Sequence, residues 1–473
     1  MSATDLQAIA PLLVLAAGSV LVLLLAAFSR HHGVTFWTSQ LTLLLSIAAL
    51  FVALPSAPRP VTPLLVVDDY GLFFSGLILV TTLAVNALAR DYLAQCSRAP
   101  QAFYILLLVA TLGALVLVAS RHFAALFLGL ETLSVALFGL IAYTQRRWRP
   151  LEAGMKYLIL AGVSAAFLLL GMALIYGETG TLAFSPMAGA GGGVRETYLL
   201  AGVALLLTGI GFKLSLVPFH MWVADIYQGA PAPVSAFLAT VSKGAVFALL
   251  LRYLPQADFY RDNSLLWALS LVAIASMLVG NWLALLQDNL KRLLAYSSVA
   301  HLGYLLVVVI AGGPLAVEAA GYYLAAYFVT LLGAFGVITL LSGAEGEAES
   351  LADYQGLFWR HPWLAAVLVL SLLSLAGIPV TMGFVAKFYV LAVGVNQMQW
   401  PLVFSLIIAS AIGLYYYLRV IVQVFRSPEA AEARAGFSLG GGLVVMAAAL
   451  VLLLLGVYPA PLMALLHGPA MLP

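Results

Sequence analysis

Long apolar stretches follow one another along almost the whole chain, and only short polar segments separate them. A helix needs about 20 predominantly apolar residues to cross the hydrocarbon core of a bilayer. By this criterion the sequence predicts fourteen membrane spans, with approximate cores at residues 7–29, 36–54, 70–89, 101–120, 123–143, 152–177, 197–222, 233–254, 264–286, 293–311, 319–341, 362–395, 402–425 and 437–458. We therefore expect an all-α polytopic membrane protein with about fourteen transmembrane helices.

The seventh and twelfth spans carry residues that break helices. As one uninterrupted helix, the twelfth would be about 50 Å long at about 1.5 Å per residue, whereas the hydrocarbon core is about 30 Å thick. Gly377 and Pro379 mark the point where we expect it to break, and Pro218 lies late in the seventh span. Broken helices at matched positions indicate the binding or conduction region of a transporter built from repeats.

The two breaks lie five spans apart, which indicates an internal repeat. A five-span unit crosses the membrane an odd number of times, so spans 4–8 and spans 9–13 are predicted to form two inverted five-helix repeats. Glu131 and His301 lie at nearly the same depth of the fifth and tenth spans, although fourteen similar segments also offer such matches by chance. The chain would then consist of an N-terminal three-helix segment, the two repeats and a C-terminal helix, at residues 1–100, 101–254, 255–426 and 427–473.

Composition agrees with a membrane protein and excludes several kinds of chemistry. Hydrophobic residues make up 64% of the 473 and charged residues only 8%, far less charge than a soluble protein of this size carries. The single cysteine, Cys96, excludes a multi-cysteine iron-sulfur or zinc site within the chain. The sequence also contains no nucleotide-binding glycine motif and no cluster of metal ligands. We therefore expect no cofactor in this chain.

The basic residues are distributed unevenly between the two sides of the membrane. Twelve fall on one face, namely Arg30, Arg90, Arg98, Arg146, Arg147, Arg149, Lys291, Arg292, Arg360, Arg419, Arg426 and Arg434. The other face has five, namely Arg59, Arg121, Arg195, Arg252 and Arg261. Because basic residues are enriched in cytoplasmic loops, the first face is predicted to be cytoplasmic and both termini to lie on the opposite side.

Lysines and arginines occupy different parts of the chain. All sixteen arginines fall in loops or near span ends, whereas four of the five lysines lie inside apolar spans, namely Lys156, Lys213, Lys243 and Lys387. An arginine supplies the same charge but does not release its proton in a protein, whereas a lysine can. This distribution therefore indicates that the buried lysines take part in proton transfer.

Glu131 is the one acidic residue deep in a span, about nine residues, or roughly 14 Å, from the outer end. If it pairs with Lys213, the pair holds that lysine protonated, and separating them sends the proton on to Lys243. Moving one charge across a membrane costs about 2.3 kcal/mol per 100 mV. An energy source outside the chain must therefore drive the separation.

Each relay residue also has a purely structural interpretation. The buried lysines would neutralise a carboxylate or bind carbonyl groups at a helix break, and Glu131 would form a structural ion pair. Lys156 lies only about four residues inside its span and would snorkel to the cytoplasmic surface. His220 and His301 would be hydrogen-bonded packing residues. The three consecutive tyrosines at 415–417 are interpreted first as an interfacial aromatic belt.

Two stretches of the chain resemble signatures of a known family. One stretch, residues 212–252, has the sequence FKLSLVPFHMWVADIYQGAPAPVSAFLATVSKGAVFALLLR. It resembles the central signature of the antiporter-like membrane subunits of respiratory complex I, which is a proton-translocating NADH:quinone oxidoreductase. The second signature of the family is similar to residues 289–306, NLKRLLAYSSVAHLGYLL. Both are long and specific, and the family's fourteen-span pattern covers essentially the whole chain.

The resemblance implies roles for seven residues and identifies partners. Glu131, Lys213, Lys243 and Lys387 match the family's proton-path residues. Lys156 matches its additional lysine in the sixth span, and His220 and His301 match its intramembrane histidines. Quinone reduction in neighbouring membrane and hydrophilic subunits would supply the energy, and those subunits would bind NADH, FMN, iron-sulfur clusters and quinone. The protein would lie in a bacterial inner membrane, with both termini on the periplasmic side.

Three functions stay open at this stage. The first is a proton-translocating subunit of a quinone-reducing respiratory complex. The second is a cation/proton antiporter, which predicts a Na⁺ or K⁺ site with converging carboxylates and is disfavoured by the single deep glutamate, Glu131. The third is a structural module that transmits conformational change without conducting, which predicts that lysine-to-methionine substitutions leave the pumping stoichiometry intact.

Overall fold

The computed structural model describes residues 2–29, 31–97, 99–144, 148–184, 194–257, 259–261, 263–313, 315–343, 346–427 and 439–467. The helices up to the first interruption are α1 (Ala3–Ala8), α2 (Ala10–Phe28), α3 (His32–Ala53), α4 (Asp69–Cys96), α5 (Gln101–Ala119), α6 (Phe123–Ile141), α7 (Trp148–Thr179) and α8 (Val194–Lys213). Those that follow are α9 (Val223–Gly229), α10 (Ala232–Phe237), α11 (Lys243–Gln256), α12 (Asn263–Leu285), α13 (Leu290–Ala311), α14 (Leu315–Leu341), α15 (Leu357–Arg360), α16 (Pro362–Ala376), α17 (Met382–Asn396), α18 (Trp400–Phe425), α19 (Leu439–Val457) and α20 (Ala460–Leu466).

The remaining regular structure is minor. Short 3-10 turns lie at Leu54–Ser56, Phe259–Arg261 and Leu351–Tyr354. Within the described residues the strands are β1 (Arg59–Pro60) and β2 (Val66–Val67), which pair antiparallel in the connection between α3 and α4.

Twelve helical segments within the described residues are long and apolar enough to cross a membrane. Three shorter apolar helices, Thr197–Lys213 within α8, α16 and α17, flank the two interruptions. The predominance of helix and the number of apolar helices confirm the prediction of an all-α polytopic membrane protein.

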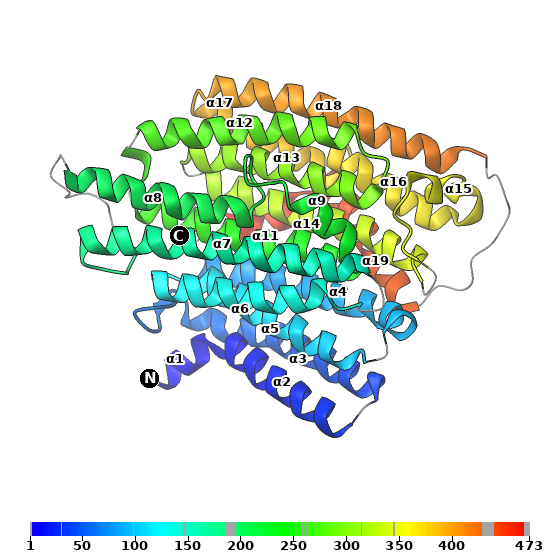
Figure 1. Ribbon diagram of the computed structural model, residues 1–473, viewed down its shortest axis with the longest axis horizontal. Coiled ribbons are helices and arrows are strands. Elements are labelled where there is room, and N and C mark those ends of the chain that lie inside the picture. The colour runs from blue at the N-terminus through cyan, green and yellow to red at the C-terminus, as the bar shows by residue number, and fades with distance from the viewer. Residues whose placement is uncertain are drawn as a thin grey trace.

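The long helices lie side by side and roughly parallel to one another (Figure 1). In that view α2 and α3 form the lower edge and α18 the upper edge, while α8 extends to the left end and α15 lies at the right. The most apolar parts of the segments Ala232–Gln256 and Leu290–Ala311 are entirely buried. The polar residues on these two segments, which include Lys243 and His301, are therefore enclosed by protein and not by lipid.

Glycines allow two pairs of consecutive helices to pack closely. A Cβ on Gly113 of α5 would lie 2.6 Å from the backbone nitrogen of Leu133 in α6. A Cβ on Gly171 of α7 would lie 2.6 Å from the carbonyl oxygen of Gly202 in α8. These distances leave no room for a side chain, as expected where membrane helices associate through small residues.

The first interruption follows α8. Residues 214–222, which include Pro218, form turns and lead into α9. The freed N–H group of Val217 donates to the hydroxyl of Ser276 in α12 at 3.0 Å. Non-helical backbone at membrane depth is tolerated where protein groups satisfy it in this way.

A second irregularity lies inside the eighth predicted span and was not predicted. Residues Leu238–Ser242 form a π turn, η2, between α10 and α11. Lys243 is the first residue after this turn. Single π turns within α-helices occur frequently at functional sites.

The second interruption separates α16 from α17. Gly377 ends α16 in the left-handed conformation with φ of 81°, and Pro379 lies in the connection that leads to Thr381 before α17. A Cβ on Gly377 would lie 2.8 Å from Cδ of Lys387. Glycine is therefore required here by its backbone angle and by the approach of the lysine.

The tyrosines at the end of α18 differ from the prediction. Tyr416 and Tyr417 are buried, and Tyr415 alone among the three is exposed, at 66%. Successive helical residues point about 100° apart, so three in a row cannot share one lipid-facing surface. The interpretation as an interfacial belt is wrong for Tyr416 and Tyr417, and the Tyr416 hydroxyl donates to Oδ1 of Asn281 at 2.9 Å.

Arg252, assigned from the sequence to the outer face, is buried near the end of α11. Its guanidinium donates two hydrogen bonds to the carboxylate of Asp68, at 2.6 and 2.8 Å. Oδ1 of Asp68 also accepts from the N–H of Gly71 and so caps the start of α4. This arginine therefore joins α4 to α11 and does not act as a solvent-exposed charge.

Candidate functional site: buried lysines beside the interrupted helices

Lys213 lies at the last residue of α8, where the first interruption begins, and is only 5% exposed. Its ammonium donates to the hydroxyl of Ser134 in α6 at 2.7 Å. The same nitrogen lies 5.7 Å from the ring centroid of Tyr157 in α7. The ring centroid of Phe212 lies 5.9 Å from this nitrogen, so the lysine charge is held by one hydroxyl and two aromatic rings.

Glu131 lies one helical turn before Ser134 in α6 and is partly buried. Among the described residues it forms no ion pair with Lys213, and its shielded Oε1 has no hydrogen-bond partner. In place of the direct pair considered from the sequence, Lys213 binds Ser134, which follows Glu131 by three residues in α6. Glu131 lies on the stripe of α6 that also carries Leu128 and Val135, which are 61% and 64% exposed.

Lys243 is almost completely buried, at 1% exposure, directly after the π turn. Its ammonium donates to the hydroxyl of Ser298 in α13 and lies 5.3 Å from the ring centroid of Tyr227 in α9. The Tyr227 hydroxyl in turn lies 3.4 Å from Oγ of Ser298. One serine therefore connects the lysine of α11 with both α13 and the first interruption.

Lys387 lies in α17 and reaches back across the second interruption. Its ammonium donates to the carbonyl of Ala376 at 2.9 Å and to the hydroxyl of Ser410 in α18 at 2.8 Å. Ala376 is the last residue of α16, where carbonyl groups lack intrahelical partners and carry partial negative charge. The same ammonium lies 5.3 Å from the ring centroid of Tyr304 in α13.

His301 lies on α13 between the contacts of Lys243 and Lys387. Its Nδ1 is 2.8 Å from the hydroxyl of Tyr323, and its Nε2 is 3.4 Å from that of Tyr417. A cavity of about 10 Å³, roughly the space for the centre of one water molecule, is lined by both His301 and Lys387. The structure therefore places His301 next to Lys387.

The structure brings the predicted residues together in two groups. One group joins Lys213 to the helix of Glu131 through Ser134. The other follows one side of α13, where Ser298 contacts Lys243, His301 follows three residues later and Tyr304 contacts Lys387. No hydrogen bond or ion pair joins the two groups within the described part of the chain.

Lys156 belongs to neither group. Its side chain is 43% exposed and forms ion pairs with Glu152 at 2.9 Å and Asp225 at 2.8 Å. Asp225, in the short helix α9 outside the spans, also binds Arg292 at 2.7 Å. Burial opposes ionisation of this carboxyl, but the hydrogen bonds from Lys156 and Arg292 outweigh it and lower the pKa of Asp225.

His220 lies in the non-helical stretch after α8 and is 6% exposed. Both of its ring nitrogens are shielded, and neither has a hydrogen bond of good geometry among the described residues. The structure therefore places His220 in the first interruption, and within the described part of the chain no hydrogen bond joins its ring to a buried lysine.

Sequence reasoning missed a fourth buried lysine. Lys291 was assigned to the cytoplasmic surface, but its side chain is 0% exposed and forms an ion pair with Glu347. Glu347 lies more than fifty positions away in the chain. The one available signal was its residue type, since all the other lysines of the chain had been assigned to spans.

The serine partners of the lysines were also missed. Lys213, Lys243 and Lys387 each donate to a serine hydroxyl on a neighbouring helix, and these serines are Ser134, Ser298 and Ser410. Serine commonly joins membrane helices, so the sequence offered no signal that distinguished these three from the others. A lysine hydrogen-bonded to a hydroxyl can be charged or neutral without leaving a polar group unpaired, because the hydroxyl both donates and accepts.

Comparison with known proteins gives three concordant results. The family model described as "NADH:quinone oxidoreductase/Mrp antiporter, TM" matches residues 120–413. A protein of Methylococcus capsulatus named NADH-quinone oxidoreductase subunit N is 51% identical over 467 residues, which are 98% of this chain and 94% of that protein.

Solved structures show the same fold. A chain of respiratory complex I from Thermus thermophilus with bound aureothin superposes with a TM-score of 0.84 at 35% identity, over 96% of this chain and 98% of that one. A chain of the Mrp complex from Dietzia sp. superposes with a TM-score of 0.87 at 21% identity, over 98% of this chain and 96% of that one. The first agrees in sequence and fold, and the second in fold alone.

Proposed function

Because this chain belongs to the family of NADH:quinone oxidoreductase and Mrp antiporter membrane subunits, we propose that it is a proton-translocating membrane subunit of complex I, of the subunit N type. It works within a proton-translocating oxidoreductase, and its partners are the other subunits of that complex. The observation that carries the proposal is the set of buried lysines beside the interrupted helices, each bound to a serine hydroxyl.

Along the proton path the lysines bind and release the proton in turn. A buried ammonium that loses its proton stays hydrogen-bonded, because the serine hydroxyl then donates to the neutral amine. Along α13 a proton passes from Lys243, at Ser298, toward His301 and on to Lys387, with the small cavity between the last two holding a water molecule. Among the described residues no hydrogen bond joins Lys213 to Lys243, so in this proposal water or movement of the interrupted helices connects them.

Energy reaches the path from neighbouring subunits through Glu131. This carboxylate lies on a stripe of α6 whose flanking residues, Leu128 and Val135, are exposed in the isolated chain. A charge change in an adjacent subunit acts on Glu131 in a medium of low dielectric constant, where charges interact strongly. The altered field at Ser134 and Lys213 then favours release or uptake of the lysine proton.

The redox chemistry belongs to other subunits. NADH, FMN, iron-sulfur clusters and quinone are bound by the partners, and this chain uses no cofactor of its own. Lys156 contributes at the cytoplasmic end of the path, where its ion pairs with Glu152 and Asp225 attract and exchange protons near the surface. His220 takes part in proton transfer at the first interruption, after the end of α8.

The fold supports fourteen crossings. The long apolar segments account for twelve of them. In chain order, the seventh crossing is α8 with residues 214–222, and the twelfth crossing is α16 together with α17. Both interruptions occur at matched positions of the two five-helix units at 101–254 and 255–426, which fits inverted repeats. The three-helix segment at 1–100 and the helix within 427–473 flank them.

Both termini lie on the periplasmic side of the bacterial inner membrane in this proposal. The orientation rests on the excess of basic residues on the other face. Several residues of that count lie outside the described residues, namely Arg30, Arg98, Arg146, Arg147 and Arg434. Arg149, Arg292, Arg360 and Arg419 lie within the described part and remain at helix ends or in connections.

A cation/proton antiporter is the second candidate, and the fold shared with the Mrp complex favours it. Such a protein needs a site where oxygen ligands converge on a cation. Among the described residues no three His, Cys, Asp or Glu side chains gather at one place. The 51% identity to a complex I subunit over nearly the full length supports the proton-translocating function better.

The test is Lys213→Met in the assembled complex. Proton pumping and NADH:quinone activity are measured in the same membranes, and assembly is checked by native gel. We expect both activities to fall together by about tenfold or more, since a lysine on an obligatory path cannot be replaced by an apolar side chain. Full activity with unchanged pumping would instead support a structural module.

A further inference from the structure

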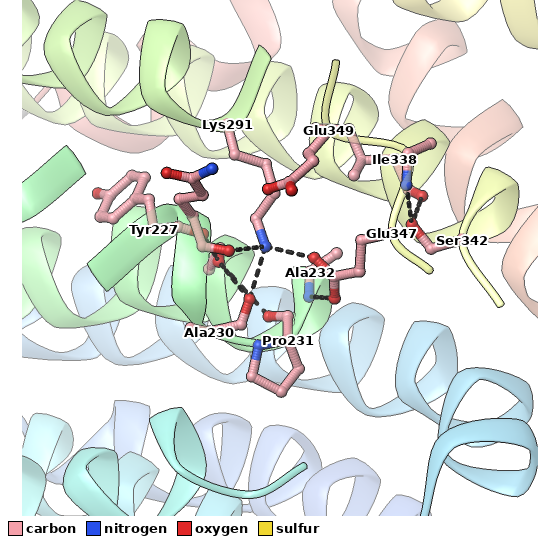
Figure 2. Close-up of polar contacts among 12 residues, drawn as sticks. Tyr227, Ala230, Pro231, Ala232, Lys291, Ile338, Ser342, Glu347 and Glu349 are labelled. Carbon is pink, nitrogen blue, oxygen red and sulfur yellow. Dashed lines mark hydrogen bonds and ion pairs between the residues drawn. The ribbon is translucent and has the colours of Figure 1, made fainter. Parts of the chain in front are cut away.

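Lys291 forms a fully buried contact centre at the start of α13. Its ammonium donates to the carbonyl of Gln228 at 3.1 Å, to the carbonyl of Ala230 at 2.6 Å and to Oε2 of Glu347 (Figure 2). A lysine has three N–H donors, so every one of them has a partner. The two carbonyls come from the end of α9 and from the residue that caps it.

Glu347 binds the other side of the same junction. Its Oε1 accepts from the N–H of Ala232, the first residue of α10, at 2.9 Å and from the hydroxyl of Tyr92 in α4 at 2.6 Å. The positive group therefore faces the carbonyl end of α9 and the negative group faces the N–H end of α10, as helix dipoles favour. Together Lys291 and Glu347 clamp the non-helical step between α9 and α10.

The clamped junction carries a residue of the proton path. Tyr227 lies in α9, three positions before Ala230, and its ring lies 5.3 Å from the ammonium of Lys243. The carbonyl of Tyr227 accepts from the hydroxyl of Ser235 in α10 at 2.8 Å, so both sides of the junction fix it. Any shift of the junction therefore moves the aromatic face that holds the Lys243 charge.

The other partner of Lys243 lies on the same helix as Lys291. Ser298 follows Lys291 by seven residues of α13, which is two turns or about 10.5 Å along one side of the helix. The clamp thus fixes the position of α9 and α10 relative to α13, and Lys243 is bound by groups from both. The register between these elements decides the distance between the lysine and its serine.

Glu347 also borders a polar cavity of 190 Å³. Its walls include Tyr92, Arg149, Gln228 and Glu349, and Glu349 pairs with Arg149 at 2.6 Å. A volume of this size holds several water molecules. The carboxylate of Glu347 therefore meets water on one side and the buried ammonium of Lys291 on the other.

We propose that Lys291 and Glu347 are positioning residues for proton transfer at Lys243: by clamping the junction of α9 and α10 to α13, they set Tyr227 and Ser298 around the ammonium. This inference rests on the proposed function, since it assigns the clamp to a step of the proton path. Neither residue touches the Lys243 ammonium in the structure, and both act through the groups that do.

The test is Glu347→Gln in the assembled complex. Glutamine can still accept from Ala232 and Tyr92 but lacks the charge that faces Lys291. We expect coupled pumping and quinone reductase activity to fall about tenfold, because a misplacement of about 1 Å in a reacting geometry is costly. The matched control is Glu349→Gln in the same loop. Glu349 pairs with Arg149, which is 68% exposed, and accepts from the side-chain amide of Asn289, which glutamine can still bind. We expect less than about a twofold change.

A double-mutant cycle with Ser298→Ala separates positioning from general damage. If Glu347 acts through Ser298, the double variant should be no slower than the slower single variant, within about twofold. Multiplication of the two losses, or full activity of assembled Glu347→Gln, would overturn the proposal. Should the glutamine variant not assemble, Glu347→Asp, which keeps the charge but withdraws it by one methylene, is taken through the same cycle.

Lys243→Met, measured in parallel, distinguishes the two levels of the argument. Loss of pumping in this variant together with a neutral Glu347→Gln would leave the proposed function standing and reject the positioning pair. Unchanged pumping in Lys243→Met would reject the proton path through this lysine, and the positioning role with it.

Discussion

Lys213 and Lys387 both lie at interrupted helices, yet they are held by different kinds of partner. Lys213 ends the helix before the break and binds Ser134, one turn from the carboxylate of Glu131. Lys387 lies in the helix after the break and binds the carbonyl that ends α16, together with Ser410. The first charge has a carboxylate nearby, whereas the second rests on a fixed helix dipole and has the imidazole of His301 beside it.

This difference suggests a division of labour between the two breaks. A carboxylate can change its charge when a neighbouring subunit acts on it, so the environment of Lys213 is adjustable. A helix end keeps its partial charge, so the hydrogen bond from Lys387 to the Ala376 carbonyl changes only if the break itself moves. In the proposed proton path, the first interruption therefore receives the signal from a neighbouring subunit and the second passes the proton on.

The largest effect is expected at Lys387, where two substitutions separate charge from proton transfer. Lys387→Met and Lys387→Arg should both lower pumping and quinone reductase activity by about 100-fold, because arginine keeps the charge but does not release its proton. The measurement is coupled activity in membranes with assembly checked. Near-normal activity of Lys387→Arg would mean that the residue merely neutralises the end of α16.

A smaller effect is expected from Gly377→Ala at the second break. The left-handed backbone angle costs about 1–2 kcal/mol for a residue with a side chain, and the added Cβ would lie 2.8 Å from Cδ of Lys387. We expect a lower melting temperature of the complex and reduced activity. Gly162→Ala is the matched control, since a Cβ there meets nothing within 4 Å, and an equal loss in both variants would contradict the assignment.

The smallest effects come from the serines and compare the two sites directly. Ser134→Ala removes the one hydrogen bond that Lys213 makes within the described residues, whereas Ser410→Ala leaves Lys387 bound to the Ala376 carbonyl. An unpaired buried donor is costly, so we expect losses of coupled activity of about fivefold and less than twofold, respectively. Equal losses would show that the helix end does not hold Lys387.

Much of the fold was predictable because its signal is local. Length and hydropathy locate the helices, and the glycine and proline positions locate both interruptions, as Gly377 and Pro218 show. Helix ends were less predictable. The third predicted span ends at 89, but α4 continues to Cys96, because a helix that leaves the lipid goes on while its polar residues find partners.

The site was predictable only in part, since burial depends on distant segments. The lysines inside apolar runs stood out by residue type, but their serine partners did not, because serine has many uses between helices. Lys291 was placed at the surface because it lies between the predicted span cores 264–286 and 293–311. Its burial comes from Glu347, which reaches it from a loop over fifty residues away.

The π turn at Leu238–Ser242 changes how the eighth span can be read. A π turn holds one more residue than an α turn, so the helix beyond it is rotated by about 100° relative to an uninterrupted one. The side chains up to Phe237 and those from Lys243 onward therefore follow two different rotational phases of the helix. Removing a single residue from this turn would give the span one continuous helical phase and preserve its hydropathy. It would also turn Lys243 away from Ser298.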